Sequence, residues 1–302
     1  MDRQCNVIIV YADDLGFGDL GCYGSHQIDT PNLDRLCGEG LKFTDAYATS
    51  AVCTRSRYSI LTVRYPFRNS QAHILPGDAG CIIEPELDTM PRLFKRAGYR
   101  TGIIGKWHLG LSDGKKPIDW NQEINLTPVD LGFDESFIFP ATADRVPCVY
   151  VEGRSVVNLD PDDPIEVSYE KECPFDDIPT YHKNPELLEM KSSNGHDMSI
   201  VGGIGRIGYM RGGKKAIWKD EDLAETFLSR ALRFIDESQE KERQIGLDIG
   251  LKELRGADEF LLIIIGGRIS EGMRREIRQA TRDGMRGRVV YMTRKEIKKV
   301  IG

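Results

Sequence analysis

Apolar positions near the start of the chain follow two spacings, one typical of buried strands and one typical of helices. The run "NVIIVYA", residues 6–12, is almost continuously apolar, which predicts a strand covered on both faces. In "TPNLDRLCGEG", Thr30 suits the N-cap and Pro31 the first helical position, and either glycine of "GEG" suits the end of the helix. "LKFTDAYA", residues 41–48, alternates and predicts a second strand.

The same alternation of strand and helix continues to residue 110. Residues 56–63 have helical spacing, and "LDTMPRLFKRAGY" predicts a helix closed by Gly98. "RTGIIGKWHLG", residues 100–110, predicts a short strand that ends in a polar loop. We therefore predict an α/β fold with a mainly parallel, mixed sheet sandwiched by helices.

The composition changes twice along the rest of the chain. Residues 121–200 are rich in Pro, Asp and Asn, which predicts a loop-rich excursion of the kind that forms substrate clefts. "DEDLAETFLSRALRFIDES", residues 220–238, predicts an amphipathic helix. After Glu240, beginning with "FLLIII", the pattern is strand–helix–strand–helix. We divide the chain into an α/β domain, residues 1–238, and a C-terminal βαβα segment, residues 239–302, packed on the sheet edge.

Composition and charge narrow the class of protein. The 302 residues carry a net charge of -6, which argues against a nucleic-acid partner. No apolar run reaches the ~20 residues of a membrane-spanning helix, so we expect no membrane partner. No leader-like segment precedes the first strand, which predicts a cytoplasmic protein as written, or a periplasmic or secreted one if a leader was trimmed. The seven scattered cysteines form no C-x-x-C pair, so neither a zinc site nor a disulfide framework is indicated.

Polar residues gather at the predicted strand ends and helix starts. Asp13 and Asp14 follow the first strand, where adjacent carboxylates can hold a hard cation, although Asp-Asp-x-Gly is also favourable turn chemistry. Lys106 and His108 end a strand in "GKWHLG", and Cys53 begins a helix. Because ligands bind at the carboxyl ends of strands in open α/β sheets, we expect these groups to share one site. A cation with Lys and Arg side chains suits a multiply charged tetrahedral oxyanion.

Four ordered motifs carry a resemblance to a known family. "NVIIVYADDLGFGDLGCYG", "TPNLDRLCGEGLKFTDAYA", "CTRSRYSILTVRYP" and "GYRTGIIGKWHLG" resemble the successive motifs of the type I sulfatases of the alkaline phosphatase superfamily, over about residues 6–238. "PATADRVPCVYVEGRSVVNLDPDDPIEV" and "GRIGYMRGGKKAIWKDEDLAETFL" are similar to the arylsulfatase-like branch, which acts on aryl sulfates or sulfated sugars. The resemblance implies a truncated sulfatase fold and a sulfuric ester hydrolase with a sulfated small molecule or sugar as substrate.

The resemblance also implies a metal and a modified residue. Asp13 and Asp14 are implied as ligands to Ca²⁺, with Mg²⁺ as the alternative ion. Cys53 is implied to be oxidised to formylglycine, whose hydrate attacks sulfur and also touches the metal. The implied partner for this oxidation is a formylglycine-generating enzyme or an anaerobic sulfatase-maturating enzyme.

Other residues are expected to contact the formylglycine hydrate or the substrate. The resemblance implies that Arg57 steadies the hydrate, that Lys106 contacts the sulfate, and that His108 contacts the formylglycine hydroxyl. His196, in "NGHD", lies in the cleft-forming excursion. It is a candidate substrate contact, with an ordinary loop histidine as the alternative.

The sequence departs from the family pattern in places that bear on activity. The family's modification signal reads Cys-x-Pro-Ser-Arg, sometimes with Ala for Pro, whereas Arg55 holds the middle position here. Val63 stands where the family has glycine, and we expect it to crowd a close backbone approach. The family's second histidine and its later acidic–amide pair and lysine are not found; "FLLIII" continues into Gly266, Gly267 and Arg268. An inactive hybrid with weak anion or metal binding, and a phosphoester hydrolase, therefore stay open as alternatives.

The C-terminal segment resembles a different group of proteins. "ADEFLLIIIGGRISEGMRREIRQATRDG" is similar to the end of small Rossmann-like proteins related to nucleoside 2-deoxyribosyltransferases. In those proteins a Ser-Glu-Gly-Met turn opens a helix near a nucleotide site, which implies that Ser270 and Glu271 face such a site. The alternative that we favour is a strand–helix unit that closes the edge of the sulfatase-like sheet.

Overall fold

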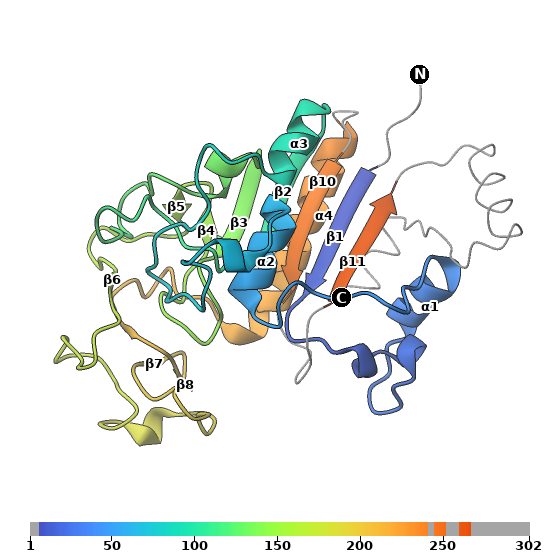
Figure 1. Cartoon of the computed structure of the whole chain (residues 1–302). Helices are drawn as coiled ribbons and strands as arrows, with labels where there is room; N and C mark the ends of the chain where they lie inside the picture. Colours follow the sequence, from blue (N-terminus) through green and yellow to red (C-terminus); the bar gives the residue numbers. More distant parts are fainter. Residues whose placement is uncertain (1–5, 241–244, 252–259, 267–302) are drawn as a thin grey trace, which may run out of the picture.

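A seven-stranded mixed sheet forms the centre of the molecule. The structure is a computed structural model that describes residues 6–240, 245–251 and 260–266. The strand order is β11-β1-β10-β2-β3-β4-β5 (Figure 1), and the predicted α/β fold class is confirmed. The strands are β1 (Asn6–Ala12), β2 (Arg100–Lys106), β3 (Glu135–Phe139), β4 (Val151–Glu152), β5 (Ser155–Val156), β10 (Ile245–Leu251) and β11 (Phe260–Gly266).

Helices cover both faces of this sheet. The helix α4 (Leu223–Glu240) packs against β2 and β10 on one face, while α2 (Cys53–Thr62) and α3 (Met90–Arg96) lie on the other (Figure 1). A Cβ on Gly102 of β2 would lie 2.8 Å from the Phe234 ring, so glycine allows α4 to approach the sheet closely. A further helix, α1 (Pro31–Glu39), lies beyond the β11 edge (Figure 1).

Most predicted elements occur, but one strand does not. The helix α1 has Thr30 at its N-cap, Pro31 first, and ends at Gly40, as predicted. Residues 41–48 form no strand, so that prediction is wrong. Their alternating Leu41, Phe43 and Tyr47 side chains are 44%, 59% and 87% exposed, because no described strand pairs with this segment.

The predicted loop-rich segment, residues 121–200, contributes β3, β4 and β5 to the main sheet, and its role as a substrate cleft stays a prediction. Together with residues 201–211 it also forms two short antiparallel pairs outside the main sheet, toward the lower left of Figure 1. One pair is β6 (Glu166–Ser168) with β9 (Tyr209–Arg211), and the other is β7 (Ile200–Val201) with β8 (Ile204–Gly205). Between these pairs the backbone is mostly turns, so side chains of this segment are positioned by loops.

Two strands of the sheet come from the chain after α4. The strand β10, which the sequence pattern did not predict, lies between β1 and β2 and is parallel to both. The predicted "FLLIII" strand is confirmed as β11, which runs antiparallel to β1 at the sheet edge. The division at residue 238 stays a prediction. Ser270, Glu271 and the rest of the predicted C-terminal helices lie outside the described residues.

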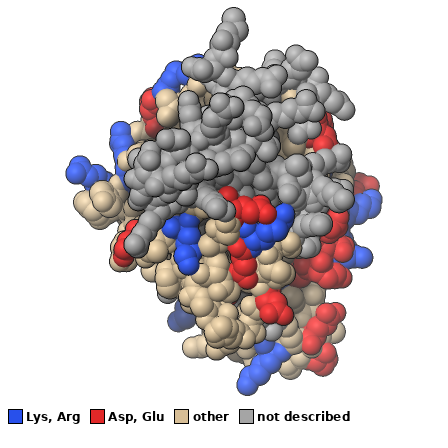
Figure 2. Space-filling model, turned by 90° about the vertical axis from the view of Figure 1, so that its right-hand side faces the viewer, with Lys and Arg blue, Asp and Glu red and all other residues tan. Residues whose placement is uncertain are grey.

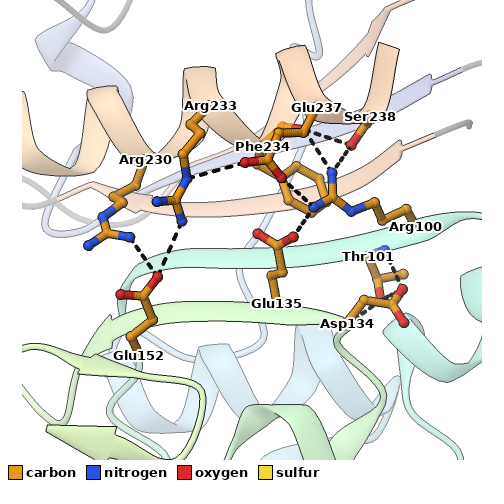
Figure 3. A network of polar contacts seen from close by, with 10 residues as sticks. All are labelled: Arg100, Thr101, Asp134, Glu135, Glu152, Arg230, Arg233, Phe234, Glu237 and Ser238. Atoms are coloured by element: carbon orange, nitrogen blue, oxygen red, sulfur yellow. Dashed lines mark hydrogen bonds and ion pairs between the residues drawn. The ribbon is translucent and has the colours of Figure 1, made fainter. Parts of the chain in front are cut away.

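A polar network fastens α4 to the start of β2 (Figure 3). Arg100 is 5% exposed, and its guanidinium stacks on the Phe234 ring with 4.5 Å between Cζ and the ring centroid. Its Nη1 donates to Ser238 Oγ at 2.7 Å, and its Nη2 donates to Glu237 Oε2 at 2.9 Å and also to Glu135. The network lies at the amino end of β2, opposite the end where Lys106 lies.

The described surface carries charges of both signs. Figure 2 shows acidic and basic side chains interspersed over the described part of one face. None of the helices in the described part of the chain is long and apolar enough to cross a membrane.

Candidate functional site

The candidate site lies where β1 and β2 end and α2 begins. Asp13 follows the last residue of β1, Lys106 is the last residue of β2, and Cys53 is the first residue of α2. The turn after β2 is held to the end of β3, because the Trp107 N–H donates to Phe139 O at 3.1 Å and the His108 N–H donates to Pro140 O at 3.0 Å. The parallel strands thus bring groups far apart in sequence to one edge of the sheet.

The first contact in the site joins Cys53 to His108. Cys53 Sγ lies 3.1 Å from His108 Nδ1, and His108 Nε2 lies 2.9 Å from Leu75 O. A carbonyl only accepts, so Nε2 carries the hydrogen and the Nδ1 lone pair faces Cys53. Burial, together with the positive charge of Lys106, lowers the pKa of His108 to about 3. The imidazole is therefore neutral and acts as an acceptor toward position 53.

The second part of the site is a buried cluster of three charged side chains. They are Asp13, Lys106 and Arg57, which are 5%, 2% and 5% exposed. Lys106 Nζ contacts Asp13 Oδ2, Arg57 Nη2 lies 3.7 Å from Asp13 Oδ1, and Arg57 Nη1 donates to Lys106 O at 2.9 Å. Burial favours the neutral carboxyl, but Lys106 and Arg57 outweigh it and lower the pKa of Asp13. Burial, reinforced by Arg57, lowers the pKa of Lys106. Two cationic side chains face one carboxylate, an arrangement that suits an anion.

Several buried atoms of this cluster lack hydrogen-bond partners within the described residues. They are Asp13 Oδ1, Arg57 Nε and Arg57 Nη2. Buried polar groups in native proteins are nearly always hydrogen-bonded, so these three atoms are candidate contacts for a bound group. An oxyanion fits the guanidinium donors, and a cation fits the carboxylate oxygen.

The residues present fit a hard cation in part. Asp13 offers its Oδ1, which accepts no hydrogen bond from the described residues, and Asp14 follows it, exposed and with a φ of 59°. Across the ranges that the structure describes, no group of three or more His, Cys, Asp or Glu side chains could hold a metal ion. Calcium prefers about 6–8 oxygen ligands, so these two aspartates alone leave most of its positions to water or other groups.

The two departures from the family pattern lie at opposite ends of α2. Arg55, in the first turn, is exposed and donates from Nε to Ala72 O at 2.8 Å. Val63 caps the carboxyl end with a φ of 55° and is 85% exposed. The expected crowding at Val63 is therefore wrong, because the side chain points into solvent. A left-handed C-cap favours glycine for its backbone freedom instead.

His196 lies outside the buried cluster. Its Nε2 lies 2.8 Å from Asp144 Oδ2 and its Nδ1 lies 2.8 Å from Ser193 Oγ. Sequence analysis missed Asp144 and Arg145, which follow β3 in "PATADRVP". The rule that drew attention to Asp13 and Lys106, polar residues just after a strand, applies equally to them.

The fold and the site together define an α/β protein with a buried cluster of charged side chains at the carboxyl edge of its sheet. The family model described as Sulfatase matches residues 5–244, and the chain belongs to the sulfatase family. A model for a domain of unknown function (DUF7768) matches residues 227–290, which does not confirm the resemblance to nucleoside 2-deoxyribosyltransferases.

Relatives with known names agree with this assignment. The chain is 50% identical over 239 residues to an N-acetylgalactosamine-6-O-sulfatase of Bacteroides thetaiotaomicron, covering 79% of this chain and 46% of that protein. It is 38% identical over 148 residues to human arylsulfatase A, covering 48% of this chain and 27% of that protein. It thus spans less than half the length of either relative.

Solved structures agree with the fold. A structure concerned with the metabolism of multiple glycosaminoglycans by Bacteroides thetaiotaomicron superposes with a TM-score of 0.80 at 48% identity, covering 84% of this chain and 52% of that one. The PsFucS1 sulfatase from Pseudoalteromonas superposes with a TM-score of 0.52 at 23% identity, covering 82% of this chain and 44% of that one. At this identity the likeness shows the fold alone.

Proposed function

We propose that this site hydrolyses a sulfate monoester, with a sulfated sugar or small aryl sulfate as substrate. The observation that carries the proposal is the Cys53 Sγ to His108 Nδ1 contact of 3.1 Å beside the buried Asp13, Lys106 and Arg57. The 50% identical relative is an N-acetylgalactosamine-6-O-sulfatase, which favours a sulfated sugar. Because the chain spans only part of that relative, the activity is proposed for this site and not taken over from the whole protein.

The nucleophile in this proposal derives from Cys53 by oxidation to formylglycine. A hydrated formylglycine supplies one hydroxyl to attack sulfur and a second whose deprotonation lets the sulfate leave. The helix N-terminus at Cys53 favours the negative charge that develops there. The conversion requires a formylglycine-generating or anaerobic sulfatase-maturating enzyme as a partner.

The surrounding side chains hold the reacting groups in place. Neutral His108 accepts a hydrogen bond from the hydroxyl at position 53 through Nδ1, because Leu75 O fixes its tautomer. Lys106 and the unpaired donors of Arg57 bind the sulfuryl oxygens as the ester bond breaks. Each such contact commonly contributes about 2.7–4 kcal/mol to the lowering of the barrier.

Asp13 and Asp14 are the residues that we propose to hold Ca²⁺, or Mg²⁺ as the alternative ion. The Oδ1 of Asp13, which accepts no hydrogen bond within the described residues, supports this role, and the side chain at position 53 is proposed to complete this part of the coordination. When bound, the ion supplies positive charge that polarises the sulfate oxygens.

A mass measurement followed by an assay tests this function. The chain is produced together with a formylglycine-generating enzyme, and the tryptic peptide of residues 43–55, which contains Cys53, is weighed. We expect the lighter aldehyde form, and turnover of para-nitrophenyl sulfate that a calcium chelator abolishes. A thiol at position 53 without turnover favours the inactive alternative, and faster turnover of para-nitrophenyl phosphate favours the phosphoester hydrolase.

A further inference from the structure

The loop after β3, residues 140–146, lies beside the candidate site and carries a charged pair that the proposed reaction does not use. Its first residue, Pro140, accepts the backbone hydrogen bond of His108 at 3.0 Å. Four and five residues further on lie Asp144 and Arg145. The positive charge of Arg145 is among the influences on the pKa of His108, which places it within electrostatic reach of that ring.

Asp144 and Arg145 belong to a defined hydrogen-bond network. Arg145 Nη1 donates to Thr142 Oγ1 at 2.7 Å and lies 3.1 Å from each carboxylate oxygen of Asp144. His196 Nε2 lies 2.8 Å from Asp144 Oδ2, and Ser193 Oγ lies 2.8 Å from His196 Nδ1. A carboxylate only accepts, so Nε2 of His196 carries a hydrogen, donates to Asp144 and orients it.

The backbone under this pair is held rigidly. Arg206, which is 2% exposed, donates from Nη1 to Ala143 O and from Nη2 to Val201 O at 3.0 Å. The Ile207 N–H donates to Asp144 O at 2.8 Å. A buried arginine and a second chain segment therefore fix where Asp144 projects, as a recognition site requires.

The pair remains accessible to a ligand. The side chains of Arg145 and Asp144 are 16% and 30% exposed. Arg145 enters this network through Nη1, and its guanidinium carries further N–H donors on Nε and Nη2. A fork of donors beside a carboxylate matches two neighbouring hydroxyls, each of which both donates and accepts.

We propose that Asp144 and Arg145 bind hydroxyl groups of the sugar ring that carries the sulfate, and that His196 is a positioning residue for Asp144. The proposal rests on the proposed function and makes its substrate a sulfated sugar. The carboxylate argues for hydroxyls and against a second sulfate-binding position, because like charges repel. His196, a candidate substrate contact from the sequence, then acts through Asp144.

Binding measurements test the proposal without turnover. The full chain is produced with Cys53 as an unconverted thiol, and calorimetry gives Kd for N-acetylgalactosamine 6-sulfate and for para-nitrophenyl sulfate, which has no sugar hydroxyls. We expect Asp144→Asn to weaken binding of the sugar sulfate about tenfold. Binding of the aryl sulfate stays unchanged or tightens, since a negative charge near the sulfate has been removed.

Two further variants separate positioning from general damage. His196→Ala should weaken the sugar sulfate about threefold to fivefold without affecting the aryl sulfate, and His196→Gln, which keeps a donor, should restore most of the loss. His182→Ala is the matched control. The His182 side chain is 75% exposed, and its Nε2 lies 3.9 Å from Asp197 Oδ2, which is too far for a strong interaction, so the substitution should change neither Kd. Thermal unfolding confirms that each variant is folded.

The outcomes decide between the two proposals. Equal losses for both ligands, an unchanged Kd for the sugar sulfate in Asp144→Asn, or a wild-type chain that does not bind the sugar sulfate overturn the hydroxyl contact. A converted protein that binds the sugar sulfate selectively but hydrolyses neither ester overturns the proposed function and leaves the hydroxyl contact standing.

Discussion

Replacing Arg100 by methionine tests how α4 is fastened to the sheet (Figure 3). Methionine keeps an unbranched apolar stem, so it opens little cavity while removing the guanidinium. The variant loses the bonds to Ser238 Oγ at 2.7 Å, Phe234 O at 3.3 Å and Glu237 Oε2 at 2.9 Å, and the stacking on Phe234. These contacts join a strand to a helix more than 130 positions later in the chain.

The magnitude follows from which partners stay buried. The carboxylates of Glu135 and Glu237 are 37% and 38% exposed, so water replaces much of what they lose and each ion pair contributes little. Ser238 is fully buried, but its Oγ keeps a 2.6 Å bond to Phe234 O. The loss is mainly the bonds to Ser238 and Phe234 and the cation–π contact, together about 2–3 kcal/mol of unfolding free energy.

Calorimetry measures the loss of stability in Arg100→Met, and an activity assay shows whether the substitution also affects the candidate site. A loss of that size lowers Tm by roughly 5 °C in a domain of this length. Arg100 and Lys106 are the two ends of the extended strand β2, ~20 Å apart, so turnover measured well below Tm should not change. Arg233→Met is the matched control, because its side chain is 49% exposed and its pairs with Glu152 and Glu237 should together contribute under about 1 kcal/mol.

Two results would refute this reasoning. If Arg100→Met lowers Tm no more than Arg233→Met, the buried network does not fasten α4. If turnover falls in the stable, folded variant, the amino end of β2 is coupled to the site at its carboxyl end.

Three other variants test the cap, the site and an acidic group. Val63→Gly should raise the unfolding free energy by about 1 kcal/mol in urea titration, because valine is strained at a φ of 55°; a loss of stability would contradict the cap argument. Lys106→Ala should lower kcat for para-nitrophenyl sulfate about 10²–10³-fold, and near-normal turnover would remove Lys106 from the site. Burial raises the pKa of Asp134, but Lys95 at 2.7 Å and Thr101 outweigh it, and the net pKa is lowered. The stabilisation is therefore present above about pH 4 and lost as pH falls through the lowered pKa. Asp134→Asn should cost about 1–2 kcal/mol at pH 7 and clearly less at pH 3, and an equal cost at both would contradict this sign.

The helices and strands that were predicted correctly are specified by residues within each element or directly beside it. Thr30 and Pro31 define the start of α1, and the continuous apolar run of residues 6–12 defines β1. Residues 41–48 have an equally clear alternation but no strand beside them, and alternation cannot supply a partner. The strand β10, "IGLDIGL", contains two glycines and an aspartate, which are poor strand formers, and it forms because two neighbours pair with it.

The sequence allowed us to predict those site residues that lie where parallel strands end, because these ends meet at one edge of the sheet. That rule brought Asp13, Lys106 and His108 together with Cys53. In the structure Cys53 contacts His108, and Lys106 contacts Asp13. It could not indicate the role of Leu75, which acts through its backbone carbonyl and not through its side chain. Such a contribution leaves no trace in residue type.

The central place of β10 constrains the order in which the sheet can assemble during synthesis. The parallel neighbour that joins β1 to β2 is absent until residue 251 has left the ribosome, long after both of those strands have emerged. Until then, the edges of β1 and β2 that pair with β10 have no partner, and their backbone groups are unpaired. A nascent chain that stalls after α4 would therefore expose two unpaired strand edges, which can pair with other chains and which chaperones can bind.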